Sequence, residues 1–252
     1  MIKIKLKTPQ EIGIMQEAGD KLKKVIADLL PQIRPGITTL LINAQAEALI
    51  NKYGGESSFS KVKNYKWATC LPINEQAVHT PPSERVLKDG DVLTVDIGLY
   101  YKGFHTDFAT SFIVGNKKNK EVVRFLEVGK MALTKALGQV KSGNHLGEIS
   151  QVIRGEIEKG GYRILKNLTG HGIGRDLHED PFVPQFLDRR VEQTYKMRPG
   201  LVLAVEVIYC QSSQDISPEK GSDWSIVSRD GSLTACFEHT VAITDRGPII
   251  IT

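Results

Sequence analysis

Two stretches of this chain, LKDGDVLTVDI (residues 87–97) and KMRPGLVLAVEV (residues 196–207), carry one pattern in two places. Their alignment pairs Gly90 with Gly200, Val92 with Val202, and Val95 with Val205. In the same register Asp96 falls on Glu206, so each apolar run holds one carboxylate at the same point. Short apolar runs bounded by turn residues are typical of buried β-strands. The pattern therefore predicts two related halves, each with a strand that carries an acidic side chain.

The segments that precede these strands repeat in the same order. Glu11 aligns with Glu121, and a glycine pair ends the second helical segment of each half, at residues 54–55 and 160–161. Helices are predicted from the capping box at Thr8 and Glu11 up to Pro31, and over residues 38–53, 119–141 and 146–159. Strands are predicted at residues 1–7, within 69–114, and at 201–210, 225–228 and 236–244, with a loop at 211–223. Two helices followed by strands, twice over, predict an α+β fold: one domain over residues 1–252, with repeats at roughly 8–115 and 118–244.

The composition is that of an ordinary globular protein and argues against several classes. The 252 residues carry 33 basic and 29 acidic side chains, a formal net charge of +4. The three cysteines, Cys70, Cys210 and Cys236, form no CxxC pair, which argues against a secreted disulfide scaffold and a structural zinc knuckle. No signal-peptide core is present, and no apolar run approaches the ~20 residues of a membrane span. The sequence therefore predicts a cytoplasmic protein that binds neither membrane nor DNA.

The basic residues form three small clusters. They are Lys3, Lys5 and Lys7; Lys61, Lys63 and Lys66; and Lys117, Lys118 and Lys120. We interpret them as solvated faces. The alternative is a weak attraction to a polyanion such as ribosomal RNA.

Asp96 and Glu206 are the most unusual residues, because each interrupts an otherwise apolar strand. A buried carboxylate is costly unless it is paired or binds a metal, so the alternatives are a solvent-facing edge strand or a buried arginine partner. Asp107 lies beyond the turn at 101–103, where a hairpin brings it to face Asp96, and Glu238 lies in another apolar run. Four such groups in one pocket raise one another's pKa, and two divalent cations balance their charge.

The remaining candidate ligand is His171, in the glycine-rich segment TGHGIGRDLHEDP at residues 169–181. The segment lacks the lysine of a nucleotide-binding loop, and Pro181 breaks the helix that a zincin motif needs at His178 and Glu179. No GxSxG elbow of a serine hydrolase is present. A lone histidine of this kind is more often structural, but four inward carboxylates beside it favour a ligand. Oxygen ligands with one imidazole suit Mn, Fe, Co or Zn.

These motifs resemble those of the type I methionine aminopeptidases, a branch of the pita-bread metallopeptidases, over essentially the whole chain. The matching segments are PINEQAVH (72–79), LKDGDVLTVDIG (87–98), KGFHTDFATSFIVG (102–115), GHGIGRDLHEDP (170–181), LAVEV (203–207) and FEHTVAITD (237–245). The resemblance implies two pseudo-symmetric halves with helices packed outside an antiparallel sheet. It also implies two divalent metal ions (Co, Mn, Fe or Zn) held by Asp96, Asp107, His171, Glu206 and Glu238.

The resemblance further implies catalytic and substrate-binding residues. Glu206 accepts a proton, His178 helps to stabilise the tetrahedral oxyanion, and His79 holds the amide nitrogen of the second substrate residue. An apolar methionine pocket is implied at Phe59, Tyr65, Cys70 and Trp224, for which ordinary core or rim positions are the alternative.

Two segments depart from the family pattern. Val207-Ile208 follows Glu206 where the family usually has proline, and Gln76-Ala77-Val78 precedes His79. The five metal-ligand positions are unaffected by either departure. The departures therefore concern the substrate pocket.

We therefore expect a hydrolase that removes the initiator methionine from nascent polypeptides, prefers a small second residue and acts as a monomer. One alternative is an Xaa-Pro peptidase of the same fold, which usually carries an extra N-terminal domain; the repeat that begins at Thr8 leaves no room for it. The other alternative is a non-catalytic module that binds peptide or ribosome. Such modules typically lose metal ligands, whereas this chain keeps all five.

Overall fold

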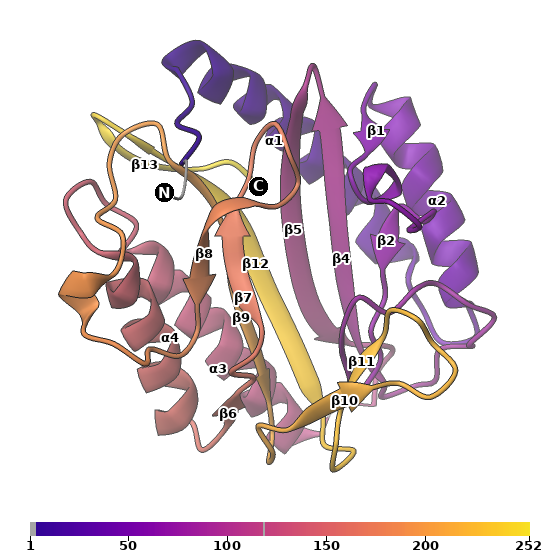
Figure 1. Cartoon of the computed structure of the whole chain (residues 1–252). Helices are drawn as coiled ribbons and strands as arrows, with labels where there is room; N and C mark the ends of the chain where they lie inside the picture. The colour runs from indigo at the N-terminus through magenta and orange to yellow at the C-terminus, as the bar shows by residue number, and fades with distance from the viewer. Residues whose placement is uncertain (1–3, 118) are drawn as a thin grey trace.

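The computed structural model describes residues 4–117 and 119–252, which form a ten-stranded antiparallel sheet and a three-stranded one (Figure 1). The large sheet contains β1 (Glu56–Ser57), β2 (Thr69–Cys70), β4 (Val92–Tyr101), β5 (Phe104–Ile113), β6 (Arg163–Ile164), β7 (Thr169–Gly172), β8 (Glu179–Pro184), β9 (Val202–Cys210), β12 (Thr234–Thr244) and β13 (Gly247–Ile250). Its main path runs β1-β4-β5-β12-β9-β7-β8, with β2 on β4, β6 on β9 and β13 on β12. The small sheet runs β10 (Ile216–Pro218), β11 (Ile226–Ser228) and β3 (Gln76–Val78).

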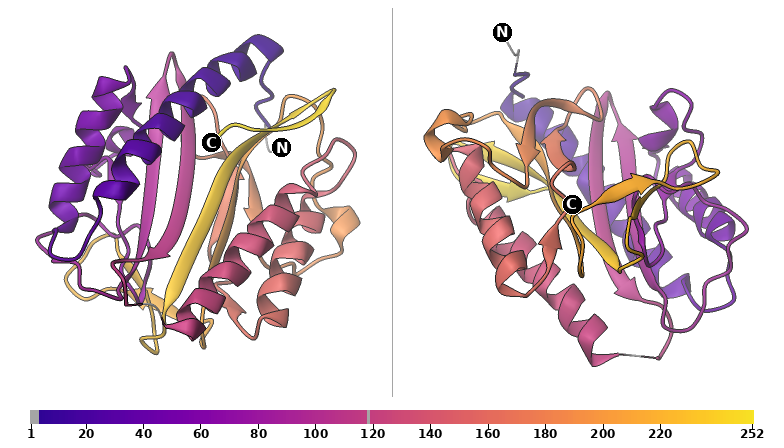
Figure 2. Two further views of the ribbon diagram at one scale, coloured as in Figure 1. Left: turned by 180° about the vertical axis from the view of Figure 1, so that it is seen from behind. Right: turned by 60° about the horizontal axis from the view of Figure 1, so that its bottom comes forward.

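Helices cover one face of the large sheet, as the left view of Figure 2 shows from behind. They are α1 (Pro9–Leu29), α2 (Thr39–Lys52), α3 (Lys120–Leu137) and α4 (Leu146–Lys159), with short 3-10 turns at Leu30–Gln32, Phe59–Lys61 and Val191–Gln193. The predicted capping box is present at the start of α1: the Glu11 carboxylate accepts the Thr8 backbone N–H at 2.8 Å, and the Thr8 hydroxyl accepts the Glu11 backbone N–H at 3.3 Å. α1 packs on β4 and β5, and α3 packs on β9 and β12. The predicted α+β architecture, with helices outside an antiparallel sheet, is confirmed.

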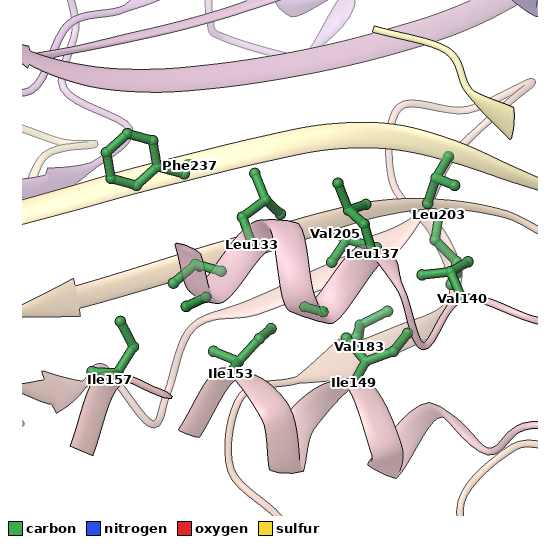
Figure 3. Close-up of a cluster of buried hydrophobic side chains, with 14 of the residues drawn as sticks. Leu133, Leu137, Val140, Ile149, Ile153, Ile157, Val183, Leu203, Val205 and Phe237 are labelled. Atoms are coloured by element: carbon green, nitrogen blue, oxygen red, sulfur yellow. The ribbon is translucent and has the colours of Figure 1, made fainter. Parts of the chain in front are cut away.

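The central strands β4 and β9 are largely buried on both faces. Beneath α3 and α4, the core includes Leu203 and Val205 of β9 (Figure 3). Val207 of the same strand belongs to this core as well. Beneath α1 and α2, it includes Leu93, Val95 and Ile97 of β4. Side chains alternate along a strand, so Asp96 and Glu206 point to the face opposite the helices. The helices therefore provide the core, and the other face is left for the functional site.

Three boundary predictions are wrong, and so is the predicted exposure of Lys7. Residues 4–7 form no strand although the alternating pattern at 1–7 predicts one, and residues 1–3 lie outside the described residues. Lys7 is buried rather than solvent-facing, because its ammonium pairs with Glu179. The stretch 211–223, predicted as a loop, contains β10, and the helix predicted over 119–141 ends at Leu137. Across the described ranges 4–117 and 119–252, no helix is both long and apolar enough to cross a membrane.

Candidate metal centre

A row of side chains crosses four adjacent strands on the face opposite the helices. Asp96 on β4 pairs with Ala109 on β5. Ala109 pairs in turn with Glu238 on β12, and Glu238 pairs with Glu206 on β9. Directly opposite residues of antiparallel strands point to the same face, so three carboxylates converge here. Ala109 contributes only a methyl group, which leaves open the space between Asp96 and Glu238.

Asp107 and His171 lie in the neighbouring row. Asp107 pairs with Gly98 on β4, and His171 on β7 pairs with Ala204 on β9. Because Gly98 lies two residues after Asp96, the side chains of Asp96 and Asp107 share one face. They are diagonal neighbours, however, because Asp96 lies opposite Ala109, two residues beyond Asp107, so the prediction that the two aspartates face each other directly is wrong. All five predicted ligands therefore point to one region of the sheet.

The predicted ligands share a buried space. The exposed fractions of Asp107 and Glu238 are 4% and 3%. One ligand atom each of Asp107, His171 and Glu238 lies within 4.8 Å of the other two. His171 Nε2 lies 3.4 Å from Glu206 Oε1, and within the part of the chain that the structure describes no lysine or arginine pairs with the four carboxylates. Neither a solvent-facing edge strand nor a buried arginine accounts for these acids.

Burial and mutual repulsion act on the ionisation of the four carboxyl groups. Burial raises the pKa of Asp96 well above its usual range, and the charges of Asp107 and Glu206 raise it further. Burial also holds the pKa of Glu206 and of Glu238 well above the usual range, with repulsion from Asp107 as the next cause. The pKa of Asp107 itself is raised to about 7 by burial. Without a cation, the cluster therefore holds protons that an exposed carboxylate would release.

The hydrogen bonds of the cluster fit a cation site. His171 Nδ1 donates to the Gly172 carbonyl oxygen at 2.9 Å, so Nε2 carries the lone pair of the neutral ring. Burial lowers the pKa of His171 to about 3. Its Nε2 lone pair therefore points toward a carboxyl oxygen of Glu206, 3.4 Å away. Among the described residues, Asp96 Oδ1 and Glu238 Oε1 are likewise buried without a hydrogen-bond partner. Converging oxygen and imidazole acceptors suit a divalent metal ion.

An apolar pocket opens beside the carboxylates and brings the remaining predicted residues together. Its lining includes Phe59, Tyr65, Cys70, Trp224, His79 and His178 with all five candidate ligands. The lining also includes Val62, Leu177 and Cys236, which were not predicted to be pocket residues. Cys236 lies two residues before Glu238 on β12, so strand alternation could have identified it. Val62 and Leu177 carry no such signal, because aliphatic side chains are equally common in a core.

Tyr65 organises one wall of this pocket. Its ring makes edge contacts with Phe59 and Trp224, at centroid distances of 6.5 and 5.1 Å. Its hydroxyl donates to the Thr69 carbonyl oxygen at 2.8 Å and lies 3.1 Å from the Cys70 thiol. The polar end of the tyrosine is therefore satisfied by the wall itself, and its ring is presented to the pocket.

Two neutral histidines lie at the pocket near the carboxylates. The rings of His178 and His171 contact each other, with centroids 4.3 Å apart. His79 adopts a left-handed backbone conformation with φ of 58°, which is uncommon for a residue other than glycine. Burial lowers the pKa of both His79 and His178, so both rings are neutral near pH 7. Each ring therefore offers one N–H donor and one acceptor nitrogen.

The two departures from the family pattern have different surroundings. Gln76 donates to both carboxylate oxygens of Glu219, at 2.9 and 2.8 Å, and accepts the Ile73 N–H at 3.0 Å. Gln76 thereby fixes the loop that carries Trp224 into the pocket. Val207 instead faces the core beneath α3 and α4 and does not line the pocket.

The fold and this set of oxygen and imidazole groups define a metallopeptidase, and residues 13–245 match metallopeptidase family M24. The chain belongs to that family. It is 37% identical over 246 residues to methionine aminopeptidase 1 of Bacillus subtilis, with 98% of each protein covered. It is 36% identical over 247 residues to the methionine aminopeptidase of Clostridium perfringens, again with 98% of each covered.

The solved structures give the same result. The methionine aminopeptidase of Thermotoga maritima, 33% identical, matches with a TM-score of 0.94 over 99% of both chains. The prolidase of Pyrococcus furiosus shares the fold at 21% identity, with a TM-score of 0.75 over 98% of this chain and 65% of its own. The predicted pita-bread fold is confirmed. Family membership and the ligand cluster together support the binding of divalent metal.

Proposed function

We propose that this chain is a metal-dependent aminopeptidase that removes the initiator methionine from nascent polypeptides and prefers a small second residue. The observation that carries the proposal is an apolar pocket that ends at four buried carboxylates and a neutral histidine. Similarity over nearly the whole chain to the methionine aminopeptidases of Bacillus subtilis and Thermotoga maritima supports it.

In this proposal, five residues hold two divalent metal ions, which are Co, Mn, Fe or Zn. The ligands are Asp96, Asp107, His171, Glu206 and Glu238. Two divalent ions match the four negative charges of the ionised carboxylates, which removes the repulsion that raises their pKa. Bound ions supply Lewis acidity at the scissile carbonyl group and make water a nucleophile near neutral pH.

The other groups act on protons and on the substrate. Glu206 accepts the proton of the attacking water at a carboxylate oxygen. The N–H of the neutral His178 ring donates to the carbonyl oxygen as negative charge develops on it. The His79 ring accepts a hydrogen bond from the amide N–H of the second substrate residue. A neutral ring can do this because one of its nitrogens carries a lone pair.

We assign the substrate's first side chain to the apolar pocket. Phe59, Tyr65, Cys70 and Trp224 surround it, and its walls carry no lysine or arginine among the lining residues that the structure describes. An unbranched side chain such as norleucine is expected to replace methionine in part, at a cost of ~1–3 kcal/mol. A lysine side chain is expected to be almost excluded, because its charge would lose water without a partner.

The proposal includes the domain organisation, the oligomeric state and the cellular location of the protein. Residues 1–252 act as one catalytic domain with its internal repeat at roughly 8–115 and 118–244. The protein acts as a monomer in the cytoplasm on emerging N-termini. The basic clusters, such as the one at Lys61, Lys63 and Lys66, contribute no more than a weak electrostatic attraction to ribosomal RNA.

Two other functions are less well supported. An Xaa-Pro peptidase shares the fold, but similarity to the Pyrococcus furiosus prolidase, at 21% identity, concerns the fold alone. A non-catalytic binding module would not need five metal-ligand candidates around one pocket, two of which have buried oxygens without a hydrogen-bond partner among the described residues. The methionine aminopeptidase function is therefore favoured.

Hydrolysis of Met-Ala-Ser and Ala-Pro-Ser, each with added Mn or Co, tests the proposal. Release of methionine from the first peptide and little cleavage of the second is the expected result. Norleucyl and lysyl versions of the first peptide then test the pocket. Preferential cleavage of Ala-Pro-Ser would favour the Xaa-Pro alternative. Equal turnover of methionyl and lysyl peptides would contradict the assigned pocket.

A further inference from the structure

A buried ion pair ties the segment before α1 to the loop that carries His178. Lys7 Nζ pairs with Glu179 Oε2, and both side chains are 1% exposed. Glu179 is the residue that follows His178. Its other oxygen, Oε1, accepts the backbone N–H of Arg175 at 2.8 Å and that of Asp176 at 3.1 Å. One carboxylate therefore joins both ends of the 175–179 loop to a lysine far away in the sequence.

The surroundings of Lys7 leave it little freedom. Its backbone N–H donates to the Gly200 carbonyl oxygen at 2.7 Å, which fixes the backbone from which the side chain extends. Gly174 lies directly against the lysine, since a Cβ at this position would overlap Lys7 Cε. The Gly174 carbonyl oxygen accepts the His105 N–H at 2.7 Å, which holds the start of the loop on β5. The lysine therefore fits one position of the loop.

Stability alone does not account for a fully buried ion pair. The free energy of removing two charges from water often exceeds their attraction, and apolar replacements are frequently neutral or stabilising. Two further ion pairs reach the same loop: Lys5 with Asp176 and, from the first turn of α1, Glu11 with Arg175. The Lys5 and Asp176 side chains are 44% and 62% exposed, where ion pairs contribute little. Of these ion pairs, the buried pair of Lys7 and Glu179 is therefore the one suited to fix the position of the 175–179 loop.

We propose that Lys7 is a positioning residue, which sets the place of the His178 ring through Glu179. The proposal rests on the proposed function, in which His178 stabilises the oxyanion. The His178 ring contacts the ring of His171, so a shift of the 175–179 loop moves it relative to the carboxylates. A misplacement of about 1 Å at such a group costs up to ~10²-fold in rate.

The first test compares two methionine substitutions in the same segment. Lys7→Met removes the buried ammonium and is expected to lower kcat about 10- to 100-fold, with a much smaller change in KM. The reason for this split is that the apolar pocket keeps its own walls. Lys5→Met is the matched control, because it breaks an exposed pair with the same loop, and it is expected to keep kcat within about twofold. Equal effects of the two substitutions, or a loss confined to KM, would overturn the proposal.

A double-mutant cycle separates positioning from a general structural role. In a His178→Asn background, Lys7→Met is expected to lower kcat by less than about threefold, because the group that it positions is already missing. The same large loss in both backgrounds would mean that Lys7 does not act through His178.

A second variant keeps the test valid if Lys7→Met unfolds. Lys7→Met combined with Glu179→Gln removes both charges, and the glutamine oxygen can still accept the N–H groups of Arg175 and Asp176. This double variant is expected to melt no lower than wild type and to retain the low kcat. Wild-type kcat in the folded double variant would contradict a positioning role.

Nuclear magnetic resonance of the metal-free protein gives a readout that does not depend on activity. The His178 ring signal, assigned with His178→Asn, is expected to shift in Lys7→Met and to stay in place in Lys5→Met. If wild type cleaves no methionyl peptide but the signal shifts, the proposed function fails and the positioning role stands. An unshifted signal in Lys7→Met overturns the positioning role whatever the activity.

Discussion

Glu238 on β12 and Glu206 on β9 lie directly opposite each other, on the sheet face that is turned away from the helices. Like charges at such positions destabilise an antiparallel pair. Burial adds to the cost, as the raised pKa values of both groups indicate. A cation between the two carboxylates turns this repulsion into attraction, so the state of the site depends on metal and on protons.

Removal of metal is expected to abolish hydrolysis while leaving the fold in place. The two cores beneath the helices are built from apolar side chains and need no metal. Return of Mn or Co at ~100 times its Kd is expected to stabilise the protein by about 2.7 kcal/mol and so to raise Tm. Activity and circular dichroism melting of one chelated and reloaded sample check both expectations. Full activity after verified removal of all divalent metal would contradict a metal-dependent site.

Protons and metal are expected to compete at Asp107. Its pKa rises to about 7 on folding, so the folded, metal-free chain binds a proton more tightly than the unfolded chain does. The stability from this group is full below about pH 4 and is lost as the pH rises through about 7. Metal affinity changes in the opposite sense and increases over the same range, because ligands must be deprotonated.

The comparison of wild type with Asp107→Asn isolates this effect from the buried histidines, which act in the opposite direction. With both proteins free of metal, the Tm of the variant minus that of wild type is expected to grow from about pH 5 to about pH 8. Titration calorimetry of wild type in buffers of different ionisation enthalpy is expected to detect proton release on metal binding. A constant Tm difference across this range would show that Asp107 does not titrate in it.

Glu206→Gln is expected to reduce kcat by ~10²–10⁴-fold at saturating metal, because the amide is neither a base nor a good ligand for a hard cation. The metal-free variant is expected to melt at or above the wild-type temperature, since a buried charge opposite Glu238 is lost. Kinetics at several metal concentrations and a melt of the metal-free protein give both values. A kcat above roughly a tenth of wild type would remove Glu206 from the proposed mechanism. Failure to fold would indicate a structural role instead.

Gln76→Met is expected to raise KM for Met-Ala-Ser up to ~10-fold, with a smaller change in kcat. The substitution keeps the size of the side chain but removes its hydrogen bonds to Glu219, and bonds to charged groups contribute about 1.5–3 kcal/mol. The loop that carries Trp224 then loses its anchor. Gln45→Met, on the outer helix α2, is the control and should leave KM unchanged. A wild-type KM in Gln76→Met would show that the anchor does not shape the pocket.

The sequence pattern is sufficient to predict that Asp96 and Glu206 lie on the same face of the sheet, because it depends only on the repeat and on the alternation of side chains along a strand. The pattern is not sufficient to predict the register of Asp96 against Asp107, because this register depends on the conformation of the turn. Lys102 and Gly103 both adopt positive φ, 47° and 90°, and form a two-residue turn that pairs Tyr101 with Phe104. This turn pairs Gly98 with Asp107 and Asp96 with Ala109, so the two aspartates are diagonal rather than opposite. A three-residue turn at 101–103 would pair residue 100 with residue 104 and shift every pair of the ladder by one residue.

The buried Lys7 illustrates a second limit. Alternating lysines at the start of a chain are typical of a half-buried strand with its charges in water. The partner that reverses this interpretation, Glu179, is distant in sequence, and no local pattern joins the two. Val62 and Leu177 were missed for a different reason, since an aliphatic side chain in a pocket wall has the same local signal as one in the core.

The short pairing between β5 and β12 means that the proposed metal site also affects how the two parts of the sheet are held together. β4 and β5 pair along their whole length, whereas β5 and β12 are registered at Ala109 with Glu238 and at Phe108 with His239. Next to them the Thr240 hydroxyl replaces a ladder bond, bridging the Asp107 N–H and carbonyl oxygen at 2.9 Å each. The candidate ligands come from both sides of this join. Bound ions would therefore crosslink the two parts of the sheet, so that the same ions would serve catalysis and also stabilise the contact between β5 and β12.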